Sequence, residues 1–287
     1  MAAPGPTHHD PGQRVDLRSH PCPFSAEWTV FNGMNEFELQ VGQYVIDKYL
    51  NEKRDVTTFD LLNLEWDLLD DVWPPYYAPG AEWFRDWIPF SEIDTFLEMG
   101  CGTGVMAVLG ALSGCSRVVA LDINPAAVHN AQLNADRHQV ADRFEARESD
   151  LFSALGQHER FDAMYWNPPI LDGPLEMNDV SGIHQAMFDS GHSRVSRFLS
   201  EGIDHLTPAG RIYISFSDSA GKFAMLTQDA QDAGLNLEII RTFAMSEVPE
   251  ALSDAFSAEL VESLKSDESY DSNETWDLHL LELCPKR

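Results

Sequence analysis

The chain has 287 residues and a net charge of −28, because its 47 Asp and Glu residues far outnumber its 19 Lys and Arg residues. So acidic a surface repels phosphate backbones, which argues against a DNA or RNA substrate and favours a small molecule, although a protein substrate is also compatible. The four scattered cysteines argue against a disulfide framework or a metal site, and the lack of a long apolar run argues against a signal peptide or a membrane span, so we expect a cytoplasmic protein.

The N-terminal part divides into a leader and an extension. Residues 1–23 contain Pro, Gly and His and predict a flexible leader. An apolar stripe predicts a helix over 36–50, and acids alternating with apolar residues over 56–72 predict two strands joined by a turn. We therefore expect an N-terminal cap over 24–80 and one main domain over 81–287.

A glycine-rich loop follows a predicted buried strand at 96–99. Gly100, Gly102 and Gly104 alternate with other residues, and the apolar run 105–111 that follows suits a packed helix. Glycines allow a tight turn and close approach of a ligand, because no Cβ stands in the way. The order of strand, loop and helix predicts a site for a nucleoside cofactor.

The next predicted strand, 117–122, ends in Asp122, which lies about 20 residues after the glycines, where a carboxylate can bind ribose hydroxyls. The alternative is that Asp122 caps the helix that begins near Pro125, and the two roles can coexist. Glu98 would repel a pyrophosphate but suits the cationic methionine part of S-adenosylmethionine, unless it only caps backbone amides. The glycine spacing also lacks the third glycine of dinucleotide sites, which favours S-adenosylmethionine.

A rigid polar corner follows a predicted strand that ends with Tyr165 and Trp166. Asn167 is followed by Pro168 and Pro169, which fix the backbone and remove two amide donors, so carbonyl oxygens are left without local partners. Such a corner suits an amine donor as ligand, and its alternative is a plain turn after a strand. The segment that follows, which contains His184, is well placed to line a substrate pocket, because such sheets bind ligands at the carboxyl ends of their strands.

The remaining pattern sets the fold class. Strands and helices alternate up to residue 217, which predicts a parallel sheet with right-handed crossovers. The runs 236–243 and 276–283 read as closing strands. Between them, the acidic stretch 247–274 reads as an insertion at the surface.

Five segments in this order resemble the class I S-adenosylmethionine-dependent methyltransferases, over roughly residues 74–245. They are FLEMGCGTG (96–104), VVALDIN (118–124), the acid of ESDLF (148–152), FDAMYWNPPI (161–170) and LTPAGRIYISFS (206–217). The resemblance implies a Rossmann-like α/β fold. Its seven-stranded sheet is mostly parallel and has a reversed C-terminal hairpin.

The resemblance also implies roles for single residues. The Asn-Pro-Pro corner is similar to the branch that methylates planar nitrogen, which includes release-factor glutamine methyltransferases and N-methyltransferases of nucleic acids. In that branch the side chain of Asn167 and the carbonyl of Pro168 would accept hydrogen bonds from the target amino group, as the catalytic residues. The cofactor residues implied are Glu98, Gly100, Gly102, Gly104, Asp122, Ile123 on the adenine face, Asp150 at the adenine amino group, and Asn167.

The predicted substrate contacts depart from the branch at one position. Ile170 stands where an aromatic residue usually follows the corner and stacks on the substrate. Other aromatic residues are candidates to replace it, and two tyrosines before the main domain are candidates for a lid. The predicted substrate-binding residues are Tyr76, Tyr77, Trp166, Ile170 and His184.

These observations favour a methyltransferase that acts on a nitrogen of a small molecule, with no nucleic-acid or membrane partner. One alternative is a protein methyltransferase of the glutamine-amide kind. An alternative of another class is a non-catalytic scaffold subunit, although that class is expected to lose the glycine loop, Asp122 or Asn167, and all are present. A NAD-dependent oxidoreductase fits worst, because the glycine spacing is wrong for it. The sequence leaves the acceptor and the oligomeric state open.

Overall fold

The fold is seen in a computed structural model, and every described residue belongs to the unit Phe37–Arg287. The described residues are 39, 42–43, 46–47, 57–75, 80–169, 171–173, 181–217, 223–243 and 277–286. The leader, the insertion predicted at 247–274, and three predicted substrate residues (Tyr76, Tyr77 and Ile170) lie outside them. Within the helix predicted at 36–50, the residues that are described are helical.

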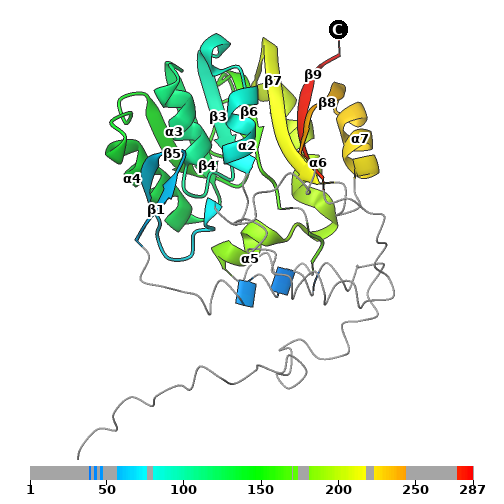
Figure 1. The fold of residues 1–287 in the computed structure, drawn as a ribbon. Helices are drawn as coiled ribbons and strands as arrows, with labels where there is room; N and C mark the ends of the chain where they lie inside the picture. Colours follow the sequence, from blue (N-terminus) through cyan, green and yellow to red (C-terminus); the bar gives the residue numbers. More distant parts are fainter. Residues whose placement is uncertain are drawn as a thin grey trace, which may run out of the picture. The chain divides into compact units, whose positions relative to one another are not determined.

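Seven strands of the described residues form one sheet in the order β5-β4-β3-β6-β7-β9-β8 (Figure 1). Strands β3 to β7 pair in parallel, and β9 runs antiparallel to its neighbours β7 and β8. The predicted mostly parallel sheet with a reversed C-terminal hairpin is therefore confirmed. The strands are β3 Thr95–Met99, β4 Arg117–Asp122, β5 Phe144–Glu148, β6 Phe161–Trp166, β7 Leu206–Ser217, β8 Leu235–Phe243 and β9 Leu278–Pro285.

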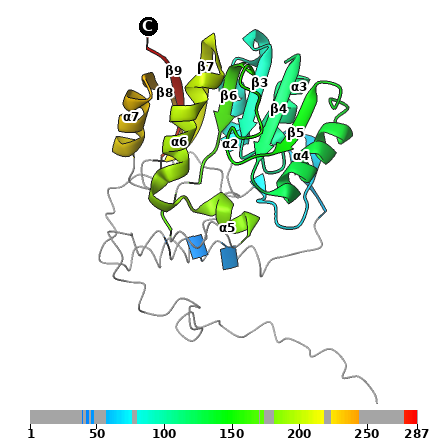
Figure 2. The same cartoon turned by 180° about the vertical axis from the view of Figure 1, so that it is seen from behind.

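Helices cover both faces of the sheet (Figures 1 and 2). Helices α3 and α4 pack in one apolar cluster with Tyr165 of β6, and α6 and α7 pack in a second cluster with Trp166. Neighbouring residues of a strand point to opposite faces, so β6 supplies both layers. The helices are α2 Gly80–Phe84, α3 Val105–Leu112, α4 Pro125–Arg137, α5 Gly182–Met187, α6 Ser193–Gly202 and α7 Phe223–Asp232, with 3-10 turns at Arg85–Trp87, Phe90–Glu92, Ser190–His192 and Ile203–His205.

Among the described helices, none combines the length and the apolar character that crossing a membrane requires.

A hairpin before the main sheet consists of β1, Thr58–Leu61, and β2, Leu64–Asp67, as the alternating pattern predicted. Two fully buried asparagines of α4 attach this segment to the domain. Asn134 accepts a hydrogen bond from the amide of Asp67 at 2.7 Å and donates to the carbonyl of Thr103 at 2.8 Å, and Asn130 accepts from the amide of Leu69 at 2.7 Å. The segment after the hairpin and the glycine loop are thus tied to the same helix.

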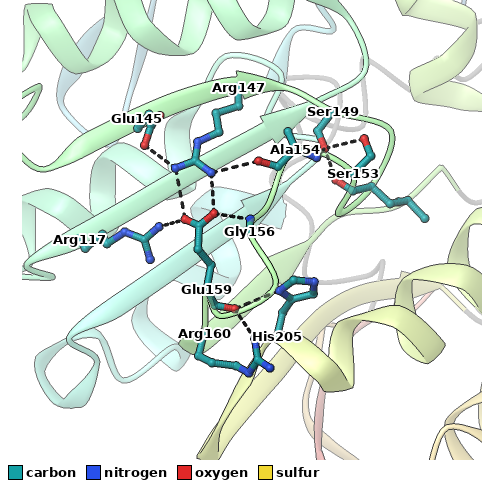
Figure 3. Close-up of polar contacts among 11 residues, drawn as sticks. Arg117, Glu145, Arg147, Ser149, Ser153, Ala154, Gly156, Glu159, Arg160 and His205 are labelled. Atoms are coloured by element: carbon teal, nitrogen blue, oxygen red, sulfur yellow. Dashed lines mark hydrogen bonds and ion pairs between the residues drawn. The ribbon is translucent and has the colours of Figure 1, made fainter.

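A charged cluster holds the loop between β5 and β6 (Figure 3). The carboxylate of Glu159 receives the guanidinium groups of both Arg117 and Arg147, and it also accepts from the amide of Gly156 at 2.7 Å. The hydrogen bond from Arg147 is the main cause that lowers the pKa of Glu159 to about 2. A carboxylate that stays charged to so low a pH anchors the loop that carries Asp150.

Candidate functional site

The glycine loop turns at the carboxyl end of β3. Gly100, Gly102 and Gly104 all have left-handed backbone angles, with φ of +57°, +52° and +76°. A Cβ at Gly100 would lie 2.8 Å from Nε1 of Trp166, and a Cβ at Gly104 would lie 2.7 Å from Cβ of Ala131. A Cβ at Gly102 would meet nothing within 4 Å among the described residues beyond its chain neighbours. The outer glycines are therefore required by packing, and the middle one borders open space that a ligand can enter.

Asp122 lies beside this loop at the end of β4. Its Oδ2 accepts a hydrogen bond from the amide of Gly102 and its Oδ1 from the amide of Asn124, both at 2.9 Å. Burial raises the pKa of Asp122, and these amides oppose that rise. The cap of α4 is Asn124, which accepts from the amide of Ala126 at 2.9 Å, and not Asp122. Because a carboxylate oxygen accepts more than one hydrogen bond, Asp122 keeps capacity for hydroxyl donors.

Ile123 follows Asp122 and is 44% exposed, which is unusual for a large apolar side chain of this domain. An exposed apolar group beside a carboxylate that has acceptor capacity suits a nucleoside, which pairs a flat base with ribose hydroxyls. The two residues fit the predicted adenosine site, although their contacts with a ligand stay predictions.

Glu98 is buried one strand away. Its Oε2 accepts a hydrogen bond from the amide of Ala107, in the first turn of α3, at 2.7 Å. Burial raises its pKa to about 8, and the nearby charge of Asp122 adds to the rise. The alternative role, capping of backbone amides, is therefore present in the structure. A nearby cation would favour the ionised form, so the predicted role toward the cofactor remains compatible with this contact.

The polar corner lies beside the glycine loop, because β6 pairs with β3 and each segment follows its strand at the same edge of the sheet. The side chain of Asn167 is exposed, whereas Pro168 and Pro169 are buried. Oδ1 of Asn167 accepts a hydrogen bond from Oγ of Ser215 at 2.6 Å, and the hydroxyl of Tyr165 lies 3.2 Å from the same Oγ. The amide of Asn167 thus has a fixed partner on β7 and an open side.

Two other predicted residues are engaged by protein neighbours. Trp166 is 4% exposed, and its ring centre lies 4.8 Å from that of Phe198 in the core below the glycine loop. This position favours a supporting role over the predicted substrate contact, which stays a prediction. Asp150 forms an ion pair with Arg197 at 3.1 Å, so an adenine amino group there would share the carboxylate with that guanidinium.

His184 lies on α5, where its Nδ1 is 2.8 Å from Oγ of Ser181, the cap of this helix. Burial lowers its pKa, so the ring is neutral at physiological pH and is not a cationic ligand. The predicted contact of His184 with substrate stays a prediction. Within the described residues, no three His, Cys, Asp or Glu side chains gather as a metal site would require.

Two residues of the site escape notice in the sequence. Asp71 accepts hydrogen bonds from the amide of Gly182 at 3.1 Å and, through its backbone oxygen, from Nδ2 of Asn124 at 2.7 Å. It thereby joins α5 to the turn after β4, which follows Asp122 directly. Ser215 is the other, and its signal in the sequence is only a polar residue inside an apolar strand.

Three comparisons place the chain among known proteins. A family model described as Methyltransferase small domain matches residues 79–233. A protein of Methanocaldococcus jannaschii, described as a candidate protein N5-glutamine methyltransferase, is 33% identical over 129 residues, which are 44% of this chain and 63% of that protein. The tRNA1(Val) (adenine(37)-N6)-methyltransferase of Shewanella loihica is 32% identical over 94 residues, which are 31% of this chain and 39% of that protein.

Among solved structures, SMU.776, described as a candidate methyltransferase complexed with SAH, is similar with a TM-score of 0.55 at 10% identity, over 81% of this chain and 57% of that one. The chain thus spans less than two thirds of the length of each of these relatives. The fold class and the S-adenosylmethionine cofactor predicted from the sequence are confirmed.

The predicted partners are corrected. From the net charge we expected a small-molecule acceptor and no nucleic-acid partner. This prediction was wrong, because the relatives above are named for protein and tRNA acceptors. The physical reason is that the net charge sums over the whole chain, whereas an acceptor is selected by the surface next to the site.

Proposed function

The chain belongs to the Methyltransferase small domain family and is an S-adenosylmethionine-dependent methyltransferase, and we propose that it methylates a planar nitrogen of a macromolecule, the side-chain amide of a glutamine in a protein. The observation that carries the proposal is the exposed amide of Asn167 at the proline corner, beside the glycine loop. The proposal rests on two separate surfaces of the site, one for the cofactor and one for the acceptor.

The cofactor surface consists of Gly102, Asp122 and Ile123. Open space borders Gly102, Asp122 has acceptor capacity for ribose hydroxyls, and Ile123 offers an exposed apolar side chain to a base. Glu98 lies one strand away with a carboxyl group that a cation would ionise. When bound, S-adenosylmethionine supplies a methyl group on a positively charged sulfur, so the protein contributes mainly alignment.

The acceptor surface is Asn167. Its Oδ1 accepts one hydrogen bond from Ser215 and has a second lone pair for an N–H of the nitrogen to be methylated. The carbonyl of Pro168 is the second acceptor that the resemblance assigns. Two acceptors hold an amino group in one orientation, and an amide oxygen takes no proton at neutral pH, so Asn167 positions the nitrogen and does not act as a base.

A glutamine amide fits this surface because it is planar and carries two N–H donors. The relative from Methanocaldococcus jannaschii, named for this kind of acceptor, has the longer match of the two relatives above. A second candidate is the exocyclic amino group of an adenine in RNA, which has the same donors and is favoured by the relative from Shewanella loihica. We place the protein acceptor first because the relative named for it matches this chain over 129 residues, against 94 residues for the tRNA methyltransferase.

Label transfer from tritiated S-adenosylmethionine tests the proposal, with bulk protein and bulk RNA from cells that lack this chain as acceptors. We expect label that a protease releases and that complete enzymatic digestion to amino acids identifies as N5-methylglutamine. Label in RNA as N6-methyladenosine would replace the first candidate with the second. Label in neither fraction would contradict both.

The variant Asn167→Ala links this activity to the corner. We expect its rate of label transfer to fall by about tenfold or more, because one acceptor of the positioning pair is lost. Its affinity for S-adenosylhomocysteine, measured by calorimetry, should stay within about twofold, since the cofactor surface is intact. A full rate in Asn167→Ala would refute the positioning role. The predicted cytoplasmic location and the division of the chain at residues 23 and 80 stay predictions.

A further inference from the structure

A chain of three hydroxyl and amide groups runs from the sheet interior to the exposed corner. Ser215 is fully buried and Tyr165 is 2% exposed, yet both carry hydroxyl groups. Buried polar groups are normally hydrogen-bonded, and here the partners lie in line. The hydroxyl of Tyr165 lies 3.2 Å from Oγ of Ser215, which donates to Oδ1 of Asn167 at 2.6 Å.

The sheet register brings these groups together. Strands β6 and β7 run parallel, and Tyr165 of β6 lies opposite Tyr213 of β7. Two residues after Tyr165 and Tyr213, the side chains again point to the same face of the sheet, so Asn167 lies across from Ser215. The first residue of α2 closes the space above, since a Cβ at Gly80 would lie 3.2 Å from the hydroxyl of Tyr165 and 3.6 Å from Oγ of Ser215.

The direction of these hydrogen bonds matters for the acceptor. The side-chain amide of Asn167 has an accepting oxygen and a donating nitrogen, and rotation by half a turn exchanges them. The amino group that receives the methyl group donates hydrogen bonds through its N–H groups. Only the oxygen of the Asn167 amide, and not its nitrogen, can therefore bind this amino group. A hydroxyl that donates to Oδ1 stabilises the productive orientation, and the flipped amide would instead need that hydroxyl to accept.

The hydroxyl of Tyr165 lies 3.2 Å from Oγ of Ser215, and either of the two atoms can be the donor. If the Tyr165 hydroxyl donates to Oγ of Ser215, the proton of Ser215 is directed to Asn167. Burial raises the pKa of the Tyr165 hydroxyl above its usual range, so this group keeps its proton at any physiological pH. The hydroxyl of Tyr165 therefore always has a proton that it can donate to Oγ of Ser215.

We propose that Ser215, supported by the Tyr165 hydroxyl, is a positioning residue that fixes the Asn167 amide with Oδ1 facing the acceptor nitrogen. This role rests on the proposed function, because it assumes that Asn167 holds the acceptor. It assigns a task to two buried side chains whose hydroxyl groups contact each other and Asn167.

Three variants test the proposal by label transfer from tritiated S-adenosylmethionine. The methyl acceptor is the bulk fraction, protein or RNA, whose labelling depends on Asn167. Ser215→Ala removes the donor and should lower the initial rate about tenfold, while affinity for S-adenosylhomocysteine stays within about twofold. Tyr165→Phe should lower the rate by about threefold, since Ser215 then donates only part of the time. Tyr213→Phe is the matched control, because it removes a buried hydroxyl from the same face outside this chain of groups, and its rate should be unchanged.

A double variant separates positioning from general damage. If Ser215 acts through Asn167, then Ser215→Ala should lower the rate of Asn167→Ala by no more than about twofold further. A loss equal to the product of the two single losses would overturn the proposal, as would a full rate in Ser215→Ala. If Ser215→Ala fails to fold, judged by thermal denaturation, Tyr165→Phe in the Asn167→Ala background gives the same comparison.

The two proposals fail in different ways. A full rate in Asn167→Ala would remove the proposed function and the positioning role together. A low rate in Asn167→Ala with a full rate in Ser215→Ala would remove only the positioning role.

Discussion

The buried carboxyl group of Glu98 makes the stability of the protein depend on pH in a calculable way. Its pKa is about 8 in the folded chain, against an ordinary value of 4.5, because it has been removed from water. Between these two values the folded state keeps a proton that the unfolded state releases. The free energy of unfolding should therefore fall as pH rises through this window, by about 1.4 kcal/mol per pH unit.

The variant Glu98→Gln isolates this effect. A glutamine oxygen can still accept from the amide of Ala107, but the side chain does not ionise. The stability of the variant relative to the wild type should increase by about 3 kcal/mol between about pH 5 and about pH 7.5. Urea denaturation of both proteins across this range measures it, and other titrating groups cancel in the difference.

A constant difference between the two proteins over that range would refute the reasoning. It would mean that Glu98 is already ionised in the folded chain and that the helix amides alone stabilise its charge. A carboxylate stabilised by its partners would make the wild type gain stability relative to the variant only below about pH 4.5, as pH rises toward the unfolded pKa.

Gly104→Ala should lower the free energy of unfolding by about 2–4 kcal/mol, because φ is +76° and the added Cβ would meet Ala131. Gly102→Ala should lower the free energy of unfolding by only about 1–2 kcal/mol. It should weaken S-adenosylhomocysteine binding about tenfold in calorimetry, because the added Cβ enters the space for the ligand. Equal losses of binding in Gly102→Ala and Gly104→Ala would contradict this. Glu159→Gln should cost about 1–2 kcal/mol at neutral pH by urea denaturation. The wild type should lose this extra stability over Glu159→Gln as pH falls from 4.5 toward 2. Acid unfolding of the two proteins over the same pH range would contradict the ion pair with Arg147.

The central strands β3, β4 and β6 were predictable because they are buried on both faces. The predicted range 117–122 coincides with β4. Central strands of a parallel sheet read as continuous apolar runs, and Gly, Pro or Asp marks where they end. The glycine loop and Asp122 were found for the same reason, since each stands directly at the end of such a run.

Contacts between residues far apart in the chain were not predictable. Ser215 reads as one polar residue in an apolar strand, and Asp71 as one acid among many. Only the register of β6 on β7, and the return of α5 to the loop after β4, give these residues partners. The burial of Trp166 also needed the structure, because alternation along β6 sets its direction but not the helix that covers it.

The polar groups of the site share one face of the sheet. Glu98 on β3 lies opposite Tyr165 on β6, and Ser215 follows on the same face of β7, whereas Trp166 points to the other face. Helices cover both faces with apolar contacts, but the buried hydroxyl and carboxyl groups of the site lie on the face that α3 and α4 cover. Substitutions on the two faces should therefore have different effects. Those near Phe198 should lower the stability without a specific loss of rate, whereas those at Ser215 should lower the rate with little loss of stability.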